Sequence, residues 1–142
     1  MKIQSLNHST YELQYHIVWG TKCRRKWLKQ YVKQELISSL YTTVKLYPTL
    51  HIEAINTDQD HVHLQIVIPP NIAISDAVRA LKARSSFQIR KKFKFIDRMY
   101  IDKDGIWSVG YFVSSIGLDE ARIKAYIEQQ DEKEKPQTVS LL

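Results

Sequence analysis

The sequence predicts an α+β fold of the ferredoxin-like type, in which a split β-α-β arrangement forms one antiparallel sheet with its helices on one face. Three observations support this prediction. Four segments have the alternation or composition of strands. Two longer segments with apolar residues at helical spacing lie after the first strand and after the third. With 142 residues, 44% of them hydrophobic, the chain can form one core.

The first strand is expected over residues 11–21, where apolar and polar residues alternate. A helix follows over about 28–47, until Pro48 ends the apolar repeat. Residues 50–55 alternate again, and a polar turn leads to a strand over 61–68. Together these two strands predict an antiparallel hairpin.

Ser75 is expected to cap a second helix that continues to about Ile89 and carries many basic residues. A turn-rich passage then leads to the fourth strand, over 106–115. An added helix with acidic residues in its first turn runs through about Gln130. Residues 131–142 are expected to form a polar, frayed tail.

The chain is expected to form a single domain over residues 1–142, because no linker or repeat divides it. No stretch approaches the roughly 18 apolar residues needed to cross a bilayer, and the first residues lack the apolar core of a signal peptide. We therefore expect a cytoplasmic protein with no membrane partner. Cys23 is the only cysteine, which excludes an internal disulfide and a thiolate zinc cage.

The net charge of +6 is concentrated in two basic clusters, over 22–33 and 79–98, that contain interleaved aromatic residues. Cations that neutralise phosphates, beside rings that stack on bases, are typical of a single-stranded nucleic-acid surface. A solvated helix face above an aromatic core would explain either cluster alone. The presence of two clusters favours nucleic acid. The candidate contacts are Lys22, Arg24, Arg25, Lys26, Arg79, Lys82, Arg84, Arg90, Lys91 and Lys92.

His61 and His63 begin the strand over 61–68, and the period of two turns both imidazoles to the same sheet face. The intervening apolar residues point toward the helix-covered core. Two neutral imidazoles held there can share one metal ion. Asp60 is placed to accept a hydrogen bond from an imidazole N–H. Surface or hydrogen-bonded histidines have the same spacing, so the motif alone leaves both interpretations open.

Tyr126 and Gln130 lie four residues apart in the last predicted helix, which places the phenol and the amide on one stripe. A glutamine on the buried side of a helix needs a partner, and a metal ion would provide one. A phenol at the core edge and a surface glutamine would account for the same spacing. Taken with the histidine pair, the arrangement suggests a nucleophile that arrives with a metal ligand.

Several motifs resemble, in the same order, those of the single-tyrosine HUH transposases, the TnpA-type enzymes of small insertion sequences that move as single-stranded DNA. The similarity covers nearly the whole chain. At Gln59 and Ala83 the chain departs from the proline and glycine that are common in the family. The matching motifs are Tyr15-His16-Ile17-Val18-Trp19 with Thr21-Lys22 and Arg24-Arg25, Asp60-His61-Val62-His63-Leu64, Leu81-Lys82 with Ser85-Ser86, Trp107-Ser108, Gly110-Tyr111-Phe112-Val113, and Tyr126-Ile127-Glu128 with Gln130.

The resemblance implies that His61, His63 and Gln130 hold a divalent metal ion. It also implies that Tyr126 attacks a DNA phosphate, which gives a 5′-phosphotyrosine link and a free 3′-hydroxyl. We expect Mg²⁺ as the cofactor, with Mn²⁺ as the alternative and zinc left open by the sequence. Because this ligand set contains no carboxylate, we expect a weak site that fills when the scissile phosphate adds its own oxygen.

The resemblance further implies a homodimer with composite active sites, in which the tyrosine helix of one subunit meets the histidines of the other. The expected partner is single-stranded DNA with hairpins at the element ends, held by the two basic clusters. Two alternatives are an HUH-type nickase with a replication or host role and a non-catalytic RRM-like nucleic-acid-binding domain. An RRM-like domain would carry aromatic residues on its exposed sheet face, where this chain places His61 and His63.

Overall fold

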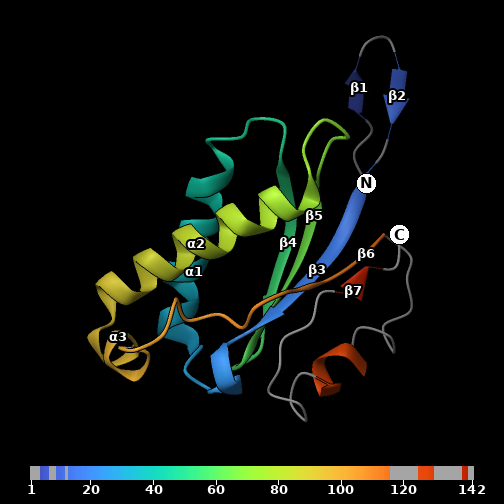
Figure 1. Cartoon of the computed structure of the whole chain (residues 1–142). Helices are drawn as coiled ribbons and strands as arrows, with labels where there is room; N and C mark the ends of the chain where they lie inside the picture. The colour runs from blue at the N-terminus through green and yellow to red at the C-terminus, as the bar shows by residue number, and fades with distance from the viewer. Residues whose placement is uncertain (1–3, 7–8, 12, 116–124, 130–138, 141–142) are drawn as a thin grey trace.

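Figure 1 shows the computed structural model, which describes residues 4–6, 9–11, 13–115, 125–129 and 139–140. Four strands pair antiparallel in the order β4-β5-β3-β6. The predicted α+β fold with a split β-α-β arrangement is confirmed. Its main elements are β3 (Gln14–Gly20), α1 (Gln30–Val44), β4 (His51–Thr57), β5 (His61–Val67), α2 (Ile74–Lys92) and β6 (Phe112–Ser115).

The two long helices, α1 and α2, pack together on one face of the sheet, and the main core lies between them and the strands (Figure 1). Val62, Leu64 and Ile66 of β5 are fully buried in this core. Leu36 of α1 and Leu81 of α2 meet them from the helix side and are also fully buried. Each such side chain contributes about 1.5–3 kcal/mol by leaving water, so this face of β5 has a fixed orientation.

Several short elements are not predicted by the sequence patterns. One of them, β7, pairs in parallel with β6 at the edge of the sheet. The prediction of a frayed tail is therefore wrong for these two residues, which pair with backbone groups at this edge of the sheet. The short elements are the hairpin of β1 (Gln4–Leu6) and β2 (Ser9–Tyr11), the 3₁₀ turn η1 (Lys22–Arg24), α3 (Lys94–Met99) and β7 (Val139–Ser140).

The fourth strand is shorter than predicted, because β6 begins only at Phe112. Residues 106–108 are all buried, whereas a half-buried strand would alternate. Gly110 has a φ of 89°, which lies outside the strand region and interrupts the extended backbone. The segment before β6 is a loop tied to the end of β3, where the Ser108 N–H donates to the Gly20 carbonyl oxygen at 2.9 Å.

The start of α2 also differs from the prediction that Ser75 caps the helix. Ala73 occupies the cap position, and its carbonyl oxygen accepts hydrogen bonds from the N–H groups of Asp76 and Ala77, both at 3.1 Å. Ser75 therefore lies inside the first turn. Among the described residues, no helix combines the length and apolar character needed to span a membrane.

A buried hydroxyl connects the helical layer to the turn at η1. The Tyr100 hydroxyl accepts from Nε1 of Trp27 at 2.8 Å and donates to the carbonyl oxygen of Lys22 at 2.6 Å. Both aromatic residues are 2% exposed. Burial raises the pKa of Tyr100 to about 12, so the phenol stays protonated and can donate.

Replacing Tyr100 by Phe should lower the free energy of unfolding by about 1–3 kcal/mol, because Trp27 and Lys22 each lose a hydrogen-bond partner in a buried place. Urea unfolding followed by circular dichroism measures this change. Tyr41→Phe is the matched control, since Tyr41 is 43% exposed on α1. Equal stability losses in the two variants would contradict a role for the Tyr100 hydroxyl.

Candidate active site

The sheet face opposite α1 and α2 carries the histidine pair. In register, Val18 of β3 stands opposite both His63 of β5 and Phe112 of β6, and Gly20 stands opposite His61. Residues directly opposite on neighbouring strands point to the same face. The predicted orientation of His61 and His63, away from the helix-covered core, is therefore confirmed.

Asp60 orients His61 through a direct hydrogen bond, with Nδ1 of His61 2.9 Å from Oδ1 of Asp60. Burial by itself raises the pKa of Asp60, but the hydrogen bond from His61 and the charge and hydrogen bond of Arg24 outweigh it. The pKa of this carboxyl therefore lies below its ordinary value. An ionised carboxylate only accepts, so Nδ1 carries the proton of this hydrogen bond and Nε2 is the ring nitrogen that could bind a cation. Metal-binding histidines commonly have this arrangement.

His63 contacts a third histidine that sequence reasoning did not single out. Nδ1 of His16 lies 3.0 Å from Nε2 of His63, so one nitrogen donates and the other accepts. The two rings are tilted by 51°, with centroids 5.0 Å apart. The alternation of β3 contained the signal, because His16 lies on the same side as Val18 and thus on the histidine face. A cation bound through Nε2 of His63 would replace the His16 contact.

Tyr126 belongs to the helical residues 125–129, which lie against the same sheet face, on the side away from α1 and α2 (Figure 1). Its side chain is 5% exposed. Its ring packs against that of Phe112, with centroids 5.2 Å apart and the ring planes tilted by 37°, and Val18 lies in the same cluster. Because Val18 is the register neighbour of His63, the tyrosine and the histidine pair share one surface of the sheet.

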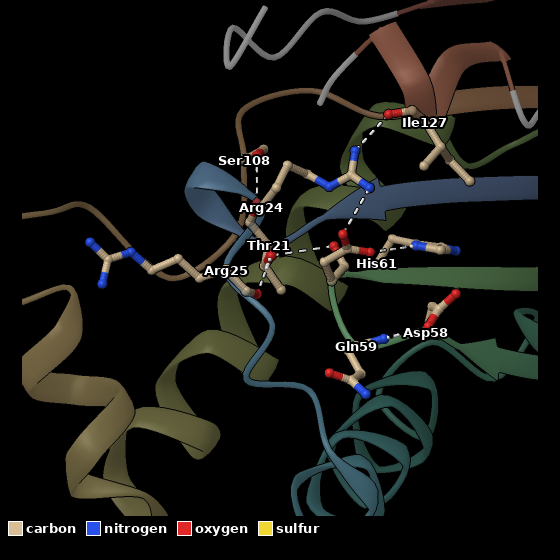
Figure 2. A network of polar contacts seen from close by, with 9 residues as sticks. Thr21, Arg24, Arg25, Asp58, Gln59, His61, Ser108 and Ile127 are labelled. Atoms are coloured by element: carbon tan, nitrogen blue, oxygen red, sulfur yellow. Dashed lines mark hydrogen bonds and ion pairs between the residues drawn. The ribbon is translucent and has the colours of Figure 1, made fainter. Parts of the chain in front are cut away.

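The guanidinium of Arg24 joins these two parts of the site. Nη2 donates to Oδ2 of Asp60 at 3.0 Å, and Nη1 donates to the carbonyl oxygen of Ile127 at 2.6 Å. Figure 2 shows the guanidinium between Ile127 and the carboxylate beside His61, while the Arg25 side chain points away from the network. The Arg24 and Asp60 side chains are 9% and 15% exposed, so their ion pair is largely shielded from water.

The turn that carries Arg24 has an unusual backbone. Cys23 and Arg24 have φ values of 59° and 52°, in the left-handed region that costs a non-glycine residue about 1 kcal/mol or more. The fully buried Thr21 holds the turn in place. Its N–H donates to the Asp60 carbonyl oxygen at 2.9 Å, and its hydroxyl donates to the Arg25 carbonyl oxygen at 2.8 Å. These contacts stabilise a conformation that local preferences disfavour.

The residues predicted to bind a metal ion are only partly described. His61 and His63 offer two imidazoles on one face, and Gln130, the third predicted ligand, lies outside the described residues. Within the described part of the chain, no three or more His, Cys, Asp or Glu side chains cluster in a way that could hold a metal. The histidine pair, with one ring oriented by Asp60, fits a divalent cation that takes its remaining ligands elsewhere.

Three of the residues predicted to contact DNA have their charged groups engaged inside the protein. Arg24 is held as described above, and Arg90 pairs with Asp97, with Nε 2.8 Å from Oδ1. The Lys82 ammonium donates to the carbonyl oxygens of Ser108 and Gly110 at 2.6 and 2.9 Å.

The other predicted DNA contacts lie nearer to solvent. Lys22 is half-buried, and its ammonium donates to the Asp104 carbonyl oxygen at 3.1 Å. Contact with DNA stays a prediction for all ten residues. The predicted contacts that are exposed are Arg25, Lys26, Arg79, Arg84, Lys91 and Lys92.

Part of the second basic cluster lines a groove between α2 and the loop before β6. The groove consists of two adjoining hollows of about 620 and 430 Å³. Arg84 lines a separate hollow with Glu35 of α1, so the cations of α2 do not form one surface. The Ser108 hydroxyl, at the groove wall, donates to the Thr21 carbonyl oxygen at 2.9 Å and connects the groove to the turn of Arg24. The cations that line the groove are Arg79, Lys82, Arg90, Lys91 and Lys94.

Comparison with known sequences gives a consistent set of relatives. The family model described as "Transposase IS200 like" matches residues 9–130. The transposase for insertion sequence element IS200 of Salmonella typhimurium is 29% identical over 132 residues, which cover 93% of this chain and 86% of the relative. The ISDra2 transposase TnpA of Deinococcus radiodurans is 30% identical over 127 residues, which cover 87% of this chain and 88% of the relative.

Solved structures show the same fold. A crystal structure of a Deinococcus radiodurans protein described as a transposase superposes with a TM-score of 0.76 at 27% identity, covering 94% of this chain and 99% of that one. A REP-associated tyrosine transposase, solved bound to a REP hairpin, has a TM-score of 0.54 at 15% identity. That alignment covers 92% of this chain and 74% of the neighbour, and at this identity it bears on the fold alone.

The pH dependence of stability should reveal the partly buried ammonium of Lys82. Burial lowers its pKa from 10.5 to about 8, and the charge of Lys22 acts in the same direction. As the pH rises from about 8 toward 10, the unfolded chain keeps this proton while the folded chain has lost it. The wild type should therefore gain about 1–2 kcal/mol relative to Lys82→Met over this window. Urea unfolding of both proteins across this range measures the difference, and a constant difference would contradict the lowered pKa.

Proposed function

This chain belongs to the family of IS200-like transposases, and we propose that it cleaves and rejoins single-stranded DNA at insertion-sequence ends through a covalent link to Tyr126. The observation that supports this most directly is the shared sheet face. Tyr126 packs beside Val18, the register neighbour of His63, and Arg24 ties its helix to the partner of His61. Family membership favours this function over the nickase and RRM-like alternatives.

In the proposed reaction, the Tyr126 phenolic oxygen attacks the phosphorus of a backbone phosphodiester in line with the departing 3′ oxygen. The new bond joins the tyrosine oxygen to phosphorus, and the bond from phosphorus to the 3′ oxygen breaks. The phenol loses one proton and the departing 3′ oxygen gains one. Because the tyrosine ester conserves the phosphodiester bond energy, a different 3′-hydroxyl can reverse the reaction without ATP.

We propose that His61, His63 and Gln130 hold Mg²⁺, with Mn²⁺ as the alternative. When bound, such an ion supplies Lewis-acid polarisation of the scissile phosphate. Asp60 keeps the Nδ1 proton of His61 in place, which leaves Nε2 as the donor atom. The packing of Tyr126 against Phe112 restricts its ring, so the entropy cost of orienting the nucleophile is reduced before DNA arrives.

The groove beside α2 is the proposed binding site for a DNA hairpin at the element end. Its lining combines the exposed cations Arg79, Lys91 and Lys94 with the aromatic side chains of Tyr111 and Phe87, which suits phosphates and unpaired bases. A hairpin is the ligand class that the resemblance to the single-tyrosine HUH transposases implies, and the family match over residues 9–130 supports it. Ser108 lines this groove and donates a hydrogen bond to Thr21, which precedes the turn of Arg24, so a bound hairpin would lie near the catalytic face.

The proposed assembly is a homodimer, because one tyrosine holds one cut end and excision produces two. The composite active site implied by the family resemblance is part of this proposal. In the described chain, the Tyr126 ring lies on its own Phe112. Exchange of the tyrosine helix between subunits would use the same Phe112 surface on the partner.

Replacing Tyr126 by Phe should abolish the covalent protein–DNA product and leave hairpin binding intact, since only the attacking oxygen is lost. The measurement incubates the protein with single-stranded DNA carrying candidate hairpins and Mg²⁺, then resolves products on a denaturing gel. Tyr47→Phe, a half-exposed tyrosine after α1, is the matched control and should retain the product. A covalent band of wild-type intensity from Tyr126→Phe would rule out this nucleophile.

His63→Ala should reduce cleavage by at least 100-fold, because it removes a ligand of the metal ion. The unfolding midpoint should change little, since the side chain is only half-buried. His51→Ala, on β4 beside Glu53, is the control and should cleave like the wild type. Initial rates measured with Mg²⁺, and with EDTA as the metal-free reference, test the assignment. Full activity in His63→Ala would overturn it.

A further inference from the structure

Arg24 directs its charge into the protein rather than toward solvent. One arm of its guanidinium reaches Oδ2 of Asp60 at 3.0 Å, and the other reaches the Ile127 carbonyl oxygen at 2.6 Å. The side chain is 9% exposed. A residue that binds a DNA phosphate offers an accessible cation, and Arg24 has both terminal nitrogens occupied by protein oxygens. Its role must therefore be sought within the site.

Asp60 extends this contact to His61. One carboxylate oxygen accepts from Arg24 and the other accepts from Nδ1 of His61 at 2.9 Å. On the other side, the Ile127 carbonyl group belongs to the residue directly after Tyr126. Three consecutive hydrogen bonds therefore connect the imidazole of His61 to the helix that carries Tyr126.

We propose that Arg24 is a positioning residue that couples the orientation of His61 to the seating of the Tyr126 helix. This inference rests on the proposed function for the roles of His61 and Tyr126. The planar guanidinium explains the residue type, because its two arms reach oxygens of different elements at once, whereas an ammonium is a single point charge. The left-handed backbone at Cys23 and Arg24 is the strained conformation that aims the side chain into this gap.

A purely structural ion pair would join the same atoms, but the two roles differ in a measurable way. Arg24 contacts both Asp60 and the helix at 125–129. If Arg24 transmits a change at Asp60, that change should loosen the helix. Coupling of this kind also makes the effects of changing Arg24 and Asp60 non-additive.

The test uses the full chain with Arg24→Ala, Asp60→Asn and the double variant. Hydrogen–deuterium exchange of the amides in 125–129, referenced to those of β3 and α1 in the same sample, reports the seating of the helix. Titration with Mn²⁺ alone, without DNA and followed by the electron paramagnetic resonance of the free ion, reports the histidine site. Arg25→Ala is the matched control, because the neighbouring guanidinium points away from the network (Figure 2).

Arg24→Ala should speed exchange in 125–129 about tenfold, since a charged hydrogen bond to the helix is lost. It should also weaken Mn²⁺ binding about tenfold, because the partner of His61 loses its own support. Asp60→Asn should also speed exchange in 125–129 and weaken Mn²⁺ binding, although the substituted side chain contacts Arg24 and His61 rather than the helix. The double variant should be no worse than Arg24→Ala, and Arg25→Ala should match the wild type in both measurements.

Additive effects in the double variant, or a change in only one of the two measurements, would overturn the coupling. If Arg24→Ala fails to fold, Asp60→Asn carries the test, and unchanged exchange in 125–129 would then reject the proposal. Arg24→Lys keeps the positive charge but cannot reach two oxygens at once, so its exchange rate in 125–129 and its Mn²⁺ affinity should lie between those of the wild type and Arg24→Ala. Wild-type values in both measurements would contradict the need for two guanidinium arms. Neither measurement uses DNA cleavage. If Tyr126→Phe still formed the covalent product, Tyr126 would be excluded as the nucleophile, but the exchange and Mn²⁺-binding results would still decide whether Arg24 couples the two parts of the site.

Discussion

The rest of the molecule depends on one constraint, which is that one face of the sheet is apolar and covered by helices while the other face carries the histidines. Val62, Leu64 and Ile66 of β5 are driven against α1 and α2, and a shift of one residue in register would expose all of them. The same alternation holds His61 and His63 on the other face. Burial of the apolar set thus determines where the imidazoles lie, so the energy that folds the domain also orients its candidate metal ligands.

Much of this arrangement could be predicted, because it depends on short-range patterns. Alternation in β3 and β5 gave these two strands and the face on which each of their residues lies, and the succession of strand and helix patterns along the chain gave the fold. The segment at 106–108 misled the prediction, since its apolar residues resemble a strand. The Trp107 indole N–H instead donates to the Ser85 hydroxyl at 3.0 Å, and consecutive residues are buried in a loop. A tertiary contact overrode the local preference there.

The candidate site was predictable in part for the same reason. His61, His63 and Asp60 are neighbours in the chain, and their spacing alone indicated a shared face. Arg24 was grouped with the basic residues, because its partners lie 36 and 103 residues away and no local pattern marks such contacts. Counting cations also overstates the free positive surface. Lys82 resembles its exposed neighbours in sequence, yet its ammonium is held by two backbone carbonyl groups.

The short strand β7 has a consequence for how copies of this chain can meet. Phe112 and Val113 pair with Val139 and Ser140, so the chain that leaves β6 returns to lie along the same edge. A second molecule that extends the sheet there must first expel this returning segment or attach beyond it. Direct pairing of a second molecule with Phe112 and Val113 therefore competes with β7 for the same backbone donors and acceptors.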